Sequence, residues 1–263
     1  MQALVSAFGA PWITAVLLLA TRIAAMLLLT PVLYAVSMPP LLRLLLVLGI
    51  ACVLALPFGA QASVVIPNTA TLVLALLREA AIGATLGLGI LLAFAGFALA
   101  GRLVDVQVGF GMAQVFDPAV RARIPVLSAV FGLLAALFFF LVDGHHALLR
   151  GLAYSLERFP LAGGGSPMTA ADAVVRQGAG LFTLGFALVA PIVLGLLLVE
   201  CVLGVIARNL PQINMLAMGI PAKILVGLFA LAVWVAGFGG PAHRLYQGIA
   251  QAWSTWFAAG GVR

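Results

Sequence analysis

Long stretches without an acidic or basic side chain alternate with short polar segments along the sequence. An α-helix rises about 1.5 Å per residue, so roughly 20 apolar residues cross the ~30 Å hydrocarbon core of a bilayer. Most of the charge-free stretches reach that length, and the pattern predicts an all-α, multi-helix integral membrane protein. The stretches are residues 1–21, 23–42, 44–77, 80–101, 124–142, 177–199 and 224–243.

Prolines and polar residues set the expected helix boundaries. Proline fits the first turn of a helix, as at Pro11 and Pro40, and either Asn68 or Thr69 is a favourable N-cap. Gly83 and Gly87 form a GxxxG pair, which lets another helix approach closely. The expected apolar helices, all within one domain over residues 1–263, are about 11–33, 40–57, 70–104, 125–142, 170–208 and 221–239.

The later part of the chain contains more polar segments. Residues 143–176 are expected to hold a loop and an amphipathic helix. A second amphipathic helix is predicted at about 243–258, because its apolar residues recur at helical spacing and its polar residues fall elsewhere on the helix. Such a helix suits either a membrane surface or a groove on a partner, and the pattern leaves both open. The apolar positions are Leu245, Ile249, Trp253 and Trp256, and the polar ones are His243, Arg244, Gln247 and Gln251.

The composition excludes a soluble enzyme. Hydrophobic residues make up 65% and charged residues 8% of the chain, whereas soluble domains are about 45–50% apolar and about 25% charged. The net charge is +6, but the basic residues are scattered, which indicates contact with lipid headgroups and not with nucleic acid. Cys52 and Cys201 lie in apolar runs and are expected to act as small hydrophobic residues. Without a basic n-region, the N-terminus is expected to be a retained first helix.

Four ionisable residues lie inside apolar segments, where a charge requires a partner or water. They are Arg22, Arg78, Glu79 and Glu200. Adjacent helical residues point about 100° apart, so Arg78 and Glu79 do not neutralise each other and each requires a partner elsewhere. Two interpretations remain open, namely a proton or ion relay in a transporter and buried pairs that hold helices in register. From the spacing we favour the second.

Candidate catalytic or metal-binding motifs are weak. Asp143-Gly144-His145-His146 contains metal-ligand types, but adjacent histidines on a helix diverge and the sequence places no third ligand nearby. We interpret this segment as a helix end with polar caps. The segment 109–114 lacks the third glycine of a dinucleotide fingerprint, and no strand precedes it. We therefore expect no catalytic residue, no metal and no cofactor, and we do not expect an enzyme.

Three sequence blocks carry a resemblance to a known family. The first is Asp105–Pro118, which reads DVQVGFGMAQVFDP, and the second is Asp143–His146, followed by Ser155 and Pro160. The third joins Glu200–Gly204 to the segment ARNLPQIN at 207–214. Together they resemble the FliR/SctT family of type III secretion export-gate subunits, over nearly the whole chain. Asp143 and Lys223 depart from the family's usual residues, so flagellar and injectisome members are not distinguished.

The resemblance implies an all-helical subunit of a flagellar export gate in the bacterial inner membrane, with helical hairpins packed into a superhelical complex. The implied partners are FliP-like and FliQ-like gate subunits, an FlhB-like switch subunit, membrane lipid and unfolded export substrates. One alternative is an SctT-type subunit of a virulence injectisome. Another is a stand-alone secondary transporter, a class that usually shows inverted repeats. No convincing repeat relates residues 1–120 to residues 121–263.

The resemblance also implies roles for individual residues. The segment between the third and fourth helices corresponds to a plug of the export channel, in which glycines bend the chain and apolar side chains seal the pore. Composition alone leaves an ordinary interhelical loop equally open. The expected gate residues are Gly109, Phe110, Gly111, Met112, Val115 and Phe116. The expected buried polar or assembly residues are Arg22, Arg78, Glu79, Asp105, Glu200, Arg208, Gln212 and Asn214.

Overall fold

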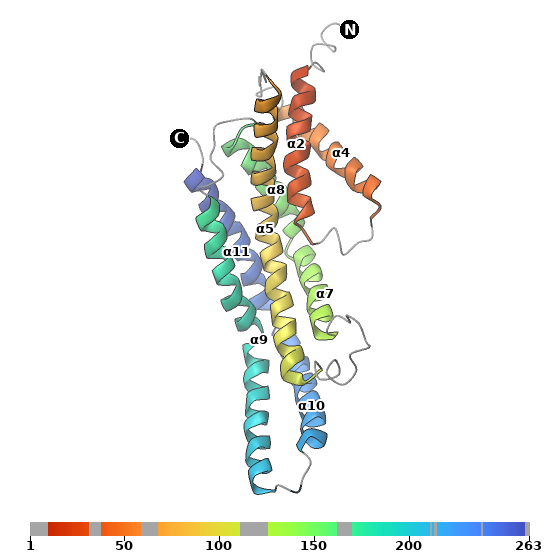
Figure 1. Ribbon diagram of the computed structural model, residues 1–263, viewed down its shortest axis with the longest axis vertical. Helices are drawn as coiled ribbons and strands as arrows, with labels where there is room; N and C mark the ends of the chain where they lie inside the picture. Colours follow the sequence, from red (N-terminus) through yellow and green to blue (C-terminus); the bar gives the residue numbers. More distant parts are fainter. Residues whose placement is uncertain are drawn as a thin grey trace. The chain divides into compact units, whose positions relative to one another are not determined.

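The computed structural model describes residues 10–31, 38–58, 68–110, 126–161, 170–210, 212, 215–237 and 239–260. Within these residues all regular secondary structure is helical, which confirms the predicted all-α class. The helices (Figure 1) are α2 (Ala10–Leu28), α4 (Pro40–Phe58), α5 (Thr69–Val108), α7 (Val126–Leu141), α8 (Gly144–Arg158), α9 (Ala170–Asn209), α10 (Met215–Val235) and α11 (Gly239–Gly260).

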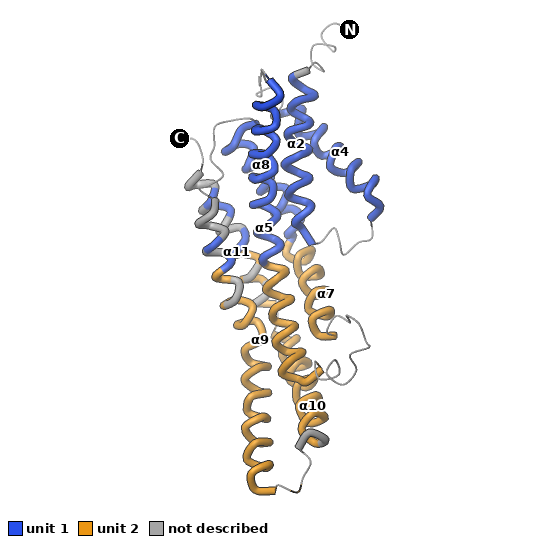
Figure 2. Tube along the Cα trace, viewed as in Figure 1, with its two compact units in different colours: residues 1–92, 143–178, 248–263 blue, residues 93–142, 179–247 orange. Residues whose placement is uncertain are grey.

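The chain divides into two compact units (Figure 2). Unit 1 comprises residues 1–92, 143–178 and 248–263, and unit 2 comprises residues 93–142 and 179–247. Because neither unit is contiguous in sequence, no composition change along the chain marks their boundary. Fully buried apolar side chains include Leu18, Ile23, Met26, Leu86 and Ile90 in unit 1, and Phe97, Val104, Phe131, Leu188 and Leu196 in unit 2.

Close contact between α2 and α5 organises unit 1. A Cβ atom on Gly83 would overlap the backbone oxygen of Arg22, and one on Gly87 would lie 2.5 Å from the backbone oxygen of Met26. The two backbones therefore touch where only glycine fits. The close helix approach predicted from the GxxxG pair is confirmed, and its partner is α2.

Two helix ends differ from the prediction for local reasons. The first helix was expected to reach residue 33, but α2 ends at Leu28, because the residue before Pro31 is disfavoured in helical backbone. The last apolar helix was expected over 221–239, but α10 begins at Met215 and contains Pro221. Proline there removes one backbone hydrogen bond, and the helix continues through it.

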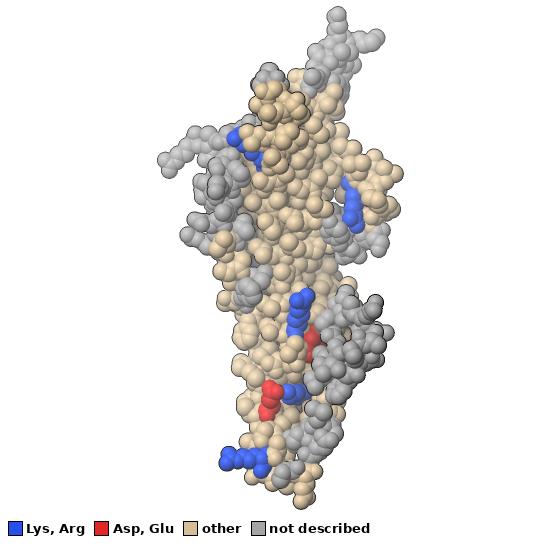
Figure 3. All heavy atoms as spheres, viewed as in Figure 1, with Lys and Arg blue, Asp and Glu red and all other residues tan. Residues whose placement is uncertain are grey.

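Five of the described helices are long and apolar enough to cross a membrane, and a sixth span arises if the bent pair α7 and α8 counts as one. This agrees with the predicted multi-helix membrane protein. Half of the α5 span is buried within the chain, whereas only 11% of the span at Met218–Val235 is. On the face shown in Figure 3, charged side chains are few and scattered among uncharged ones. The exposed apolar surface therefore requires lipid or a partner to cover it.

The C-terminal helix α11 buries its apolar stripe against its own chain. In unit 1, Ile249, Trp253 and Trp256 are each more than nine-tenths buried. A Cβ atom on Gly89 of α5 or on Gly151 of α8 would lie within 3 Å of the Trp253 side chain. The predicted amphipathic pattern is confirmed at these positions. Its apolar face packs on helices of the same chain. The two interpretations left open by the sequence were a membrane surface and a groove on a partner, and neither included this packing.

Candidate functional site

A buried arginine joins three elements of unit 1. Arg22 of α2 is 0% exposed, and its Nε donates to Glu79 Oε2 of α5 at 2.5 Å. Its Nη1 donates to Ser155 Oγ of α8 at 3.0 Å, and its Nη2 donates to the backbone oxygen of Phe159 at 2.9 Å. Each guanidinium nitrogen therefore has an acceptor, and the carboxylate compensates the charge. This arrangement fixes the register of α2, α5 and α8.

The arginine cluster shows which residue pairs with Glu79. Glu79 points inward and is 2% exposed, whereas Arg78, one residue earlier on the helix, is half-buried. The two neighbours diverge as the spacing predicted. The pairing of Glu79 with Arg22 favours the structural interpretation over a relay.

We expect Gly83→Ala to destabilise the chain more than an ordinary glycine substitution. The added methyl group would overlap the Arg22 backbone, so α2 must move and the Arg22–Glu79 hydrogen bond must lengthen. Overpacking a core by a methyl group costs about 1–3 kcal/mol where side chains can adjust, and a backbone neighbour adjusts less. Gly49→Ala is the matched control, because a Cβ atom there meets nothing within 4 Å. Equal thermal unfolding midpoints for the two variants would contradict this account.

Asp105 organises the end of α5 and the start of α7 in unit 2. Its carboxylate is 2% exposed and accepts hydrogen bonds from Leu127 N at 3.0 Å, Ser128 N at 2.8 Å and Ser128 Oγ at 2.8 Å. It thereby satisfies N–H groups that the first turn of α7 leaves without a helical partner. The backbone oxygen of Asp105 accepts Gly109 N at 3.2 Å and Phe110 N at 3.1 Å. One residue thus holds both ends of the segment expected to be the plug.

The third helix was expected to end near residue 104, because Asp105 and Gln107 look polar. In the structure α5 continues to Val108, since the Asp105 carboxylate finds donors on α7 and does not need water. The helix ends at Gly109, whose φ of +95° is a conformation that favours glycine.

We expect Asp105→Ala to lower the stability of the protein by about 1–3 kcal/mol, the usual cost of leaving a buried donor without an acceptor. Asp105→Asn should cost less, because the amide oxygen still accepts one of the two backbone N–H groups. Ser128→Ala removes only the hydroxyl donor and serves as the mild control. The measurement is the thermal unfolding midpoint of the detergent-solubilised protein, and an equal midpoint for Asp105→Ala and Ser128→Ala would overturn the capping role.

Glu200 has a partner in its own chain, which the sequence analysis did not foresee. Lys223 Nζ of α10 donates to Glu200 Oε1 of α9 at 2.6 Å. The Glu200 side chain is 52% exposed and that of Lys223 is 21% exposed. Glu200 is therefore half exposed in this chain by itself, and its burial within an assembly stays a prediction. The signal that was missed is Lys223, a cation within an apolar run.

The remaining predicted assembly and gate residues are either exposed, half-buried or outside the described residues. Arg208 and Gln212 are exposed within this chain, so burial there would require a covering partner. Asn214 lies outside the described residues. Among the predicted gate residues, Gly109 and Phe110 are half-buried at the end of α5. The remaining gate residues, Gly111, Met112, Val115 and Phe116, lie outside the described residues.

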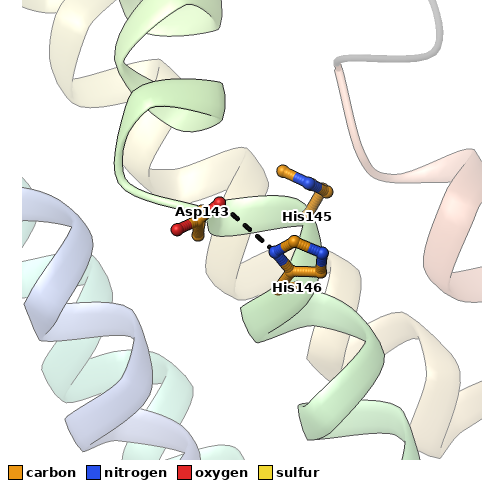
Figure 4. A group of neighbouring side chains, drawn as sticks. All are labelled: Asp143, His145 and His146. Carbon is orange, nitrogen blue, oxygen red and sulfur yellow. Dashed lines mark hydrogen bonds and ion pairs between the residues drawn. The ribbon is translucent and has the colours of Figure 1, made fainter.

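The side chain of Asp143 does not form the polar helix cap that the sequence predicted. Asp143 precedes α8, but its side chain accepts no hydrogen bond from a backbone N–H group of the first turn. Its backbone adopts φ 54° and ψ 34°. Its carboxylate Oδ1 instead lies 3.2 Å from His146 Nδ1 (Figure 4). The helix does end at this segment as predicted, but the side chains contact each other and not the backbone.

Tyr246 is a buried polar residue that the sequence analysis missed. Its hydroxyl donates to the backbone oxygen of Ala135 at 2.6 Å. Its ring centroid lies 5.8 Å from that of Phe97 and 6.0 Å from that of Phe139. Burial raises the pKa of the Tyr246 phenol well above its ordinary value, so the neutral donor is retained. Its position three residues before Ile249, on the apolar stripe of α11, is the signal that could have found it.

Known proteins resemble this chain over most of its length. Residues 13–249 match the family described as Bacterial export proteins, family 1. The chain is 35% identical over 162 residues to the flagellar biosynthetic protein FliR of Bacillus subtilis (strain 168), across 59% of this chain and 61% of that protein. It is 34% identical over 158 residues to FliR of Pectobacterium carotovorum subsp. carotovorum, across 60% of each. It is 30% identical over 155 residues to FliR of Escherichia coli (strain K12), across 59% of each.

The alignments with these three relatives span about three fifths of the relatives' own lengths. The family match extends further, from α2 into α11, and includes the residues of the arginine cluster, Asp105 and the Glu200–Lys223 pair.

Proposed function

Because the chain belongs to family 1 of the bacterial export proteins, we propose that it is a core subunit of the flagellar type III protein export gate. In this proposal it assembles with FliP-like and FliQ-like subunits in the bacterial inner membrane and contacts an FlhB-like switch subunit. The assembly passes unfolded flagellar proteins across the membrane. The family is one of export proteins and not of enzymes, and the work of this chain is to form and close a passage.

The observation that carries the proposal is the extent of the family match, residues 13–249. The relatives described above carry the name of a flagellar biosynthetic protein. Those names favour a flagellar role over an injectisome role.

The exposed apolar surface of the chain supports a role within a larger membrane assembly. On α4, Leu41 is 66% exposed and Leu56 is 67% exposed. On α10, Leu225 is 70% exposed and Phe229 is 71% exposed. Helices of this kind need lipid or partner helices around them.

We further propose that the segment between α5 and α7 is the plug of the channel. Asp105 supports this role, because its carboxylate and its backbone oxygen hold the two sides of the segment. A plug requires fixed ends, since a seal that drifts from the pore would leak.

Co-purification tests the proposed function. The chain is produced with an affinity tag, alone or together with the FliP-like and FliQ-like proteins of the same bacterium, and is extracted in mild detergent. We expect a single stable particle with all three proteins on co-production. We expect aggregation or degradation of the chain produced alone, because its apolar faces remain uncovered. A monodisperse chain alone that captures neither partner would overturn the export-gate proposal.

Deletion of the gene separates the flagellar proposal from its injectisome alternative. A flagellar gate subunit is required for swimming, so deletion abolishes motility and a plasmid copy restores it. Normal motility after deletion, with loss of effector secretion, would instead establish the injectisome role.

A further inference from the structure

The junction between α7 and α8 brings three metal-ligand side chains together. Asp143, His145 and His146 lie within one turn at the start of α8 (Figure 4). One ligand atom from each lies within 4.8 Å of the other two. The Asp143 side chain is 73% exposed and that of His146 is 58% exposed, so the rest of the chain leaves the group uncovered.

Asp143 adopts a left-handed backbone immediately before α8, and both histidines lie in the first turn of that helix. Among the described residues, Asp143 alone of the non-glycine residues has a positive φ. Side chains of adjacent helical residues normally point about 100° apart. Here the His145 and His146 ring centroids lie 4.1 Å apart, and the Asp143 carboxylate contacts the His146 ring from three residues earlier in the chain. The structure thus removes both objections that the sequence raised against a metal.

The geometry points to a site for a divalent transition metal of the zinc type, with Asp143, His145 and His146 as its ligands. Imidazole nitrogen and carboxylate oxygen are ligands that such ions accept. In a tetrahedral site with bonds of about 2.0–2.2 Å, neighbouring ligand atoms are about 3.3 Å apart. Asp143 Oδ1 and His146 Nδ1 are 3.2 Å apart, and the His145 ligand atom lies within 4.8 Å of both residues' ligand atoms, so His145 must rotate to enter the same shell.

Three protein ligands leave one position for water or for a side chain of a partner. The bound ion replaces the proton shared by Asp143 and His146, and it stabilises the left-handed backbone that holds the carboxylate in place. This inference rests on the geometry of one turn and is independent of the proposed export function. Failure of either leaves the other standing.

Cobalt and zinc binding to the full chain test the site. The full chain is produced in its own bacterium, so that it keeps its native partners whichever they are, purified in mild detergent through a tag without histidine, and titrated with Co²⁺, whose visible absorption reports tetrahedral coordination. We expect one Co²⁺ per chain, displaced by Zn²⁺. His145→Ala and His146→Ala should each weaken binding at least tenfold, and Asp143→Asn should weaken it while keeping a residue that tolerates the left-handed backbone. His243→Ala is the matched control and should bind as the parent does.

A second measurement avoids mutation, in case a histidine variant fails to fold. Diethyl pyrocarbonate modifies accessible imidazoles, and His243 is an exposed internal reference. We expect Zn²⁺ to slow modification of His145 and His146 but not of His243. Equal modification with and without Zn²⁺, or Co²⁺ binding that the His145 and His146 variants retain, would overturn the site and leave the Asp143–His146 contact as an ordinary hydrogen bond.

Discussion

Glu79→Leu is expected to remove most of the chain from the membrane fraction, whereas Glu79→Gln should retain most of it. Leucine leaves the Arg22 guanidinium buried without a counter-charge, since Arg22 is 0% exposed. Removing one partner of a buried pair costs about 3–5 kcal/mol. A typical domain is stable by only about 5–15 kcal/mol, so the loss is a large share of the total. Glutamine keeps an oxygen that accepts from Arg22 Nε, and its cost is smaller.

Two companion variants sharpen this result. Glu200→Leu should be milder in the chain alone, because Glu200 is 52% exposed and its Lys223 partner retains access to the surroundings. The double variant Arg22→Leu with Glu79→Leu should recover part of the Glu79→Leu loss, since no charge remains buried. Recovery is incomplete, because the backbone oxygen of Phe159 then loses its donor.

Complex yield and motility are measured in parallel for these variants. A structural pair predicts that motility follows yield in every variant. If Glu79→Gln assembles fully but abolishes motility, Glu79 acts as a proton relay and the structural assignment is wrong.

The fold was predictable because charge-free runs of about 20 residues allow few structures in a membrane protein. One helix boundary failed because a tertiary contact overrides local preference, and another because a helix continues through a proline. Asp105 looked like a helix end, but its carboxylate is buried against α7, so the helix continues to Val108. Pro221 looked like a first-turn residue, but α10 begins six residues earlier.

The sequence predicted that the charged residues in apolar segments require partners, but it did not predict which residues those partners are. Arg22 and Glu79 are 57 residues apart in sequence, and nothing in the linear pattern connects them. Gly83 is the residue that lets their helices meet, and its GxxxG spacing was readable. The approach of the His145 and His146 rings depends on side-chain conformation, which helical periodicity does not encode.

Hydropathy also leaves open what covers each helix, because lipid and an apolar partner are equivalent surroundings for leucine. The span at Pro40–Pro57 is 17% buried within the chain and that at Met218–Val235 is 11% buried. Those values show that this chain leaves most of these two spans uncovered. They are consistent with the proposed gate, in which partner subunits cover part of that surface.

Removal of the proposed plug is expected to make the membrane leak ions while the complex still assembles. Deleting residues 110–116, or changing Phe110, Met112 and Phe116 together to alanine, removes the apolar bulk assigned to the seal. A hydrophobic constriction closes a channel by excluding water, and shorter side chains admit water and ions. Single substitutions should leak less, because the flexible Met112 side chain and its neighbours fill part of the gap.

Assembly should survive the triple substitution because the contacts that hold α5 and α7 come from Asp105, which remains in place. The assay is ion conductance across the membrane, or growth at raised salt, in cells that produce the whole complex. Complex yield is measured alongside. Phe140→Ala is the matched control, since it removes an aromatic side chain that is 50% exposed on α7, outside the segment. If the triple variant assembles normally and remains as tight as the parent, the segment between α5 and α7 is an ordinary interhelical loop, and the seal must be sought elsewhere in the complex.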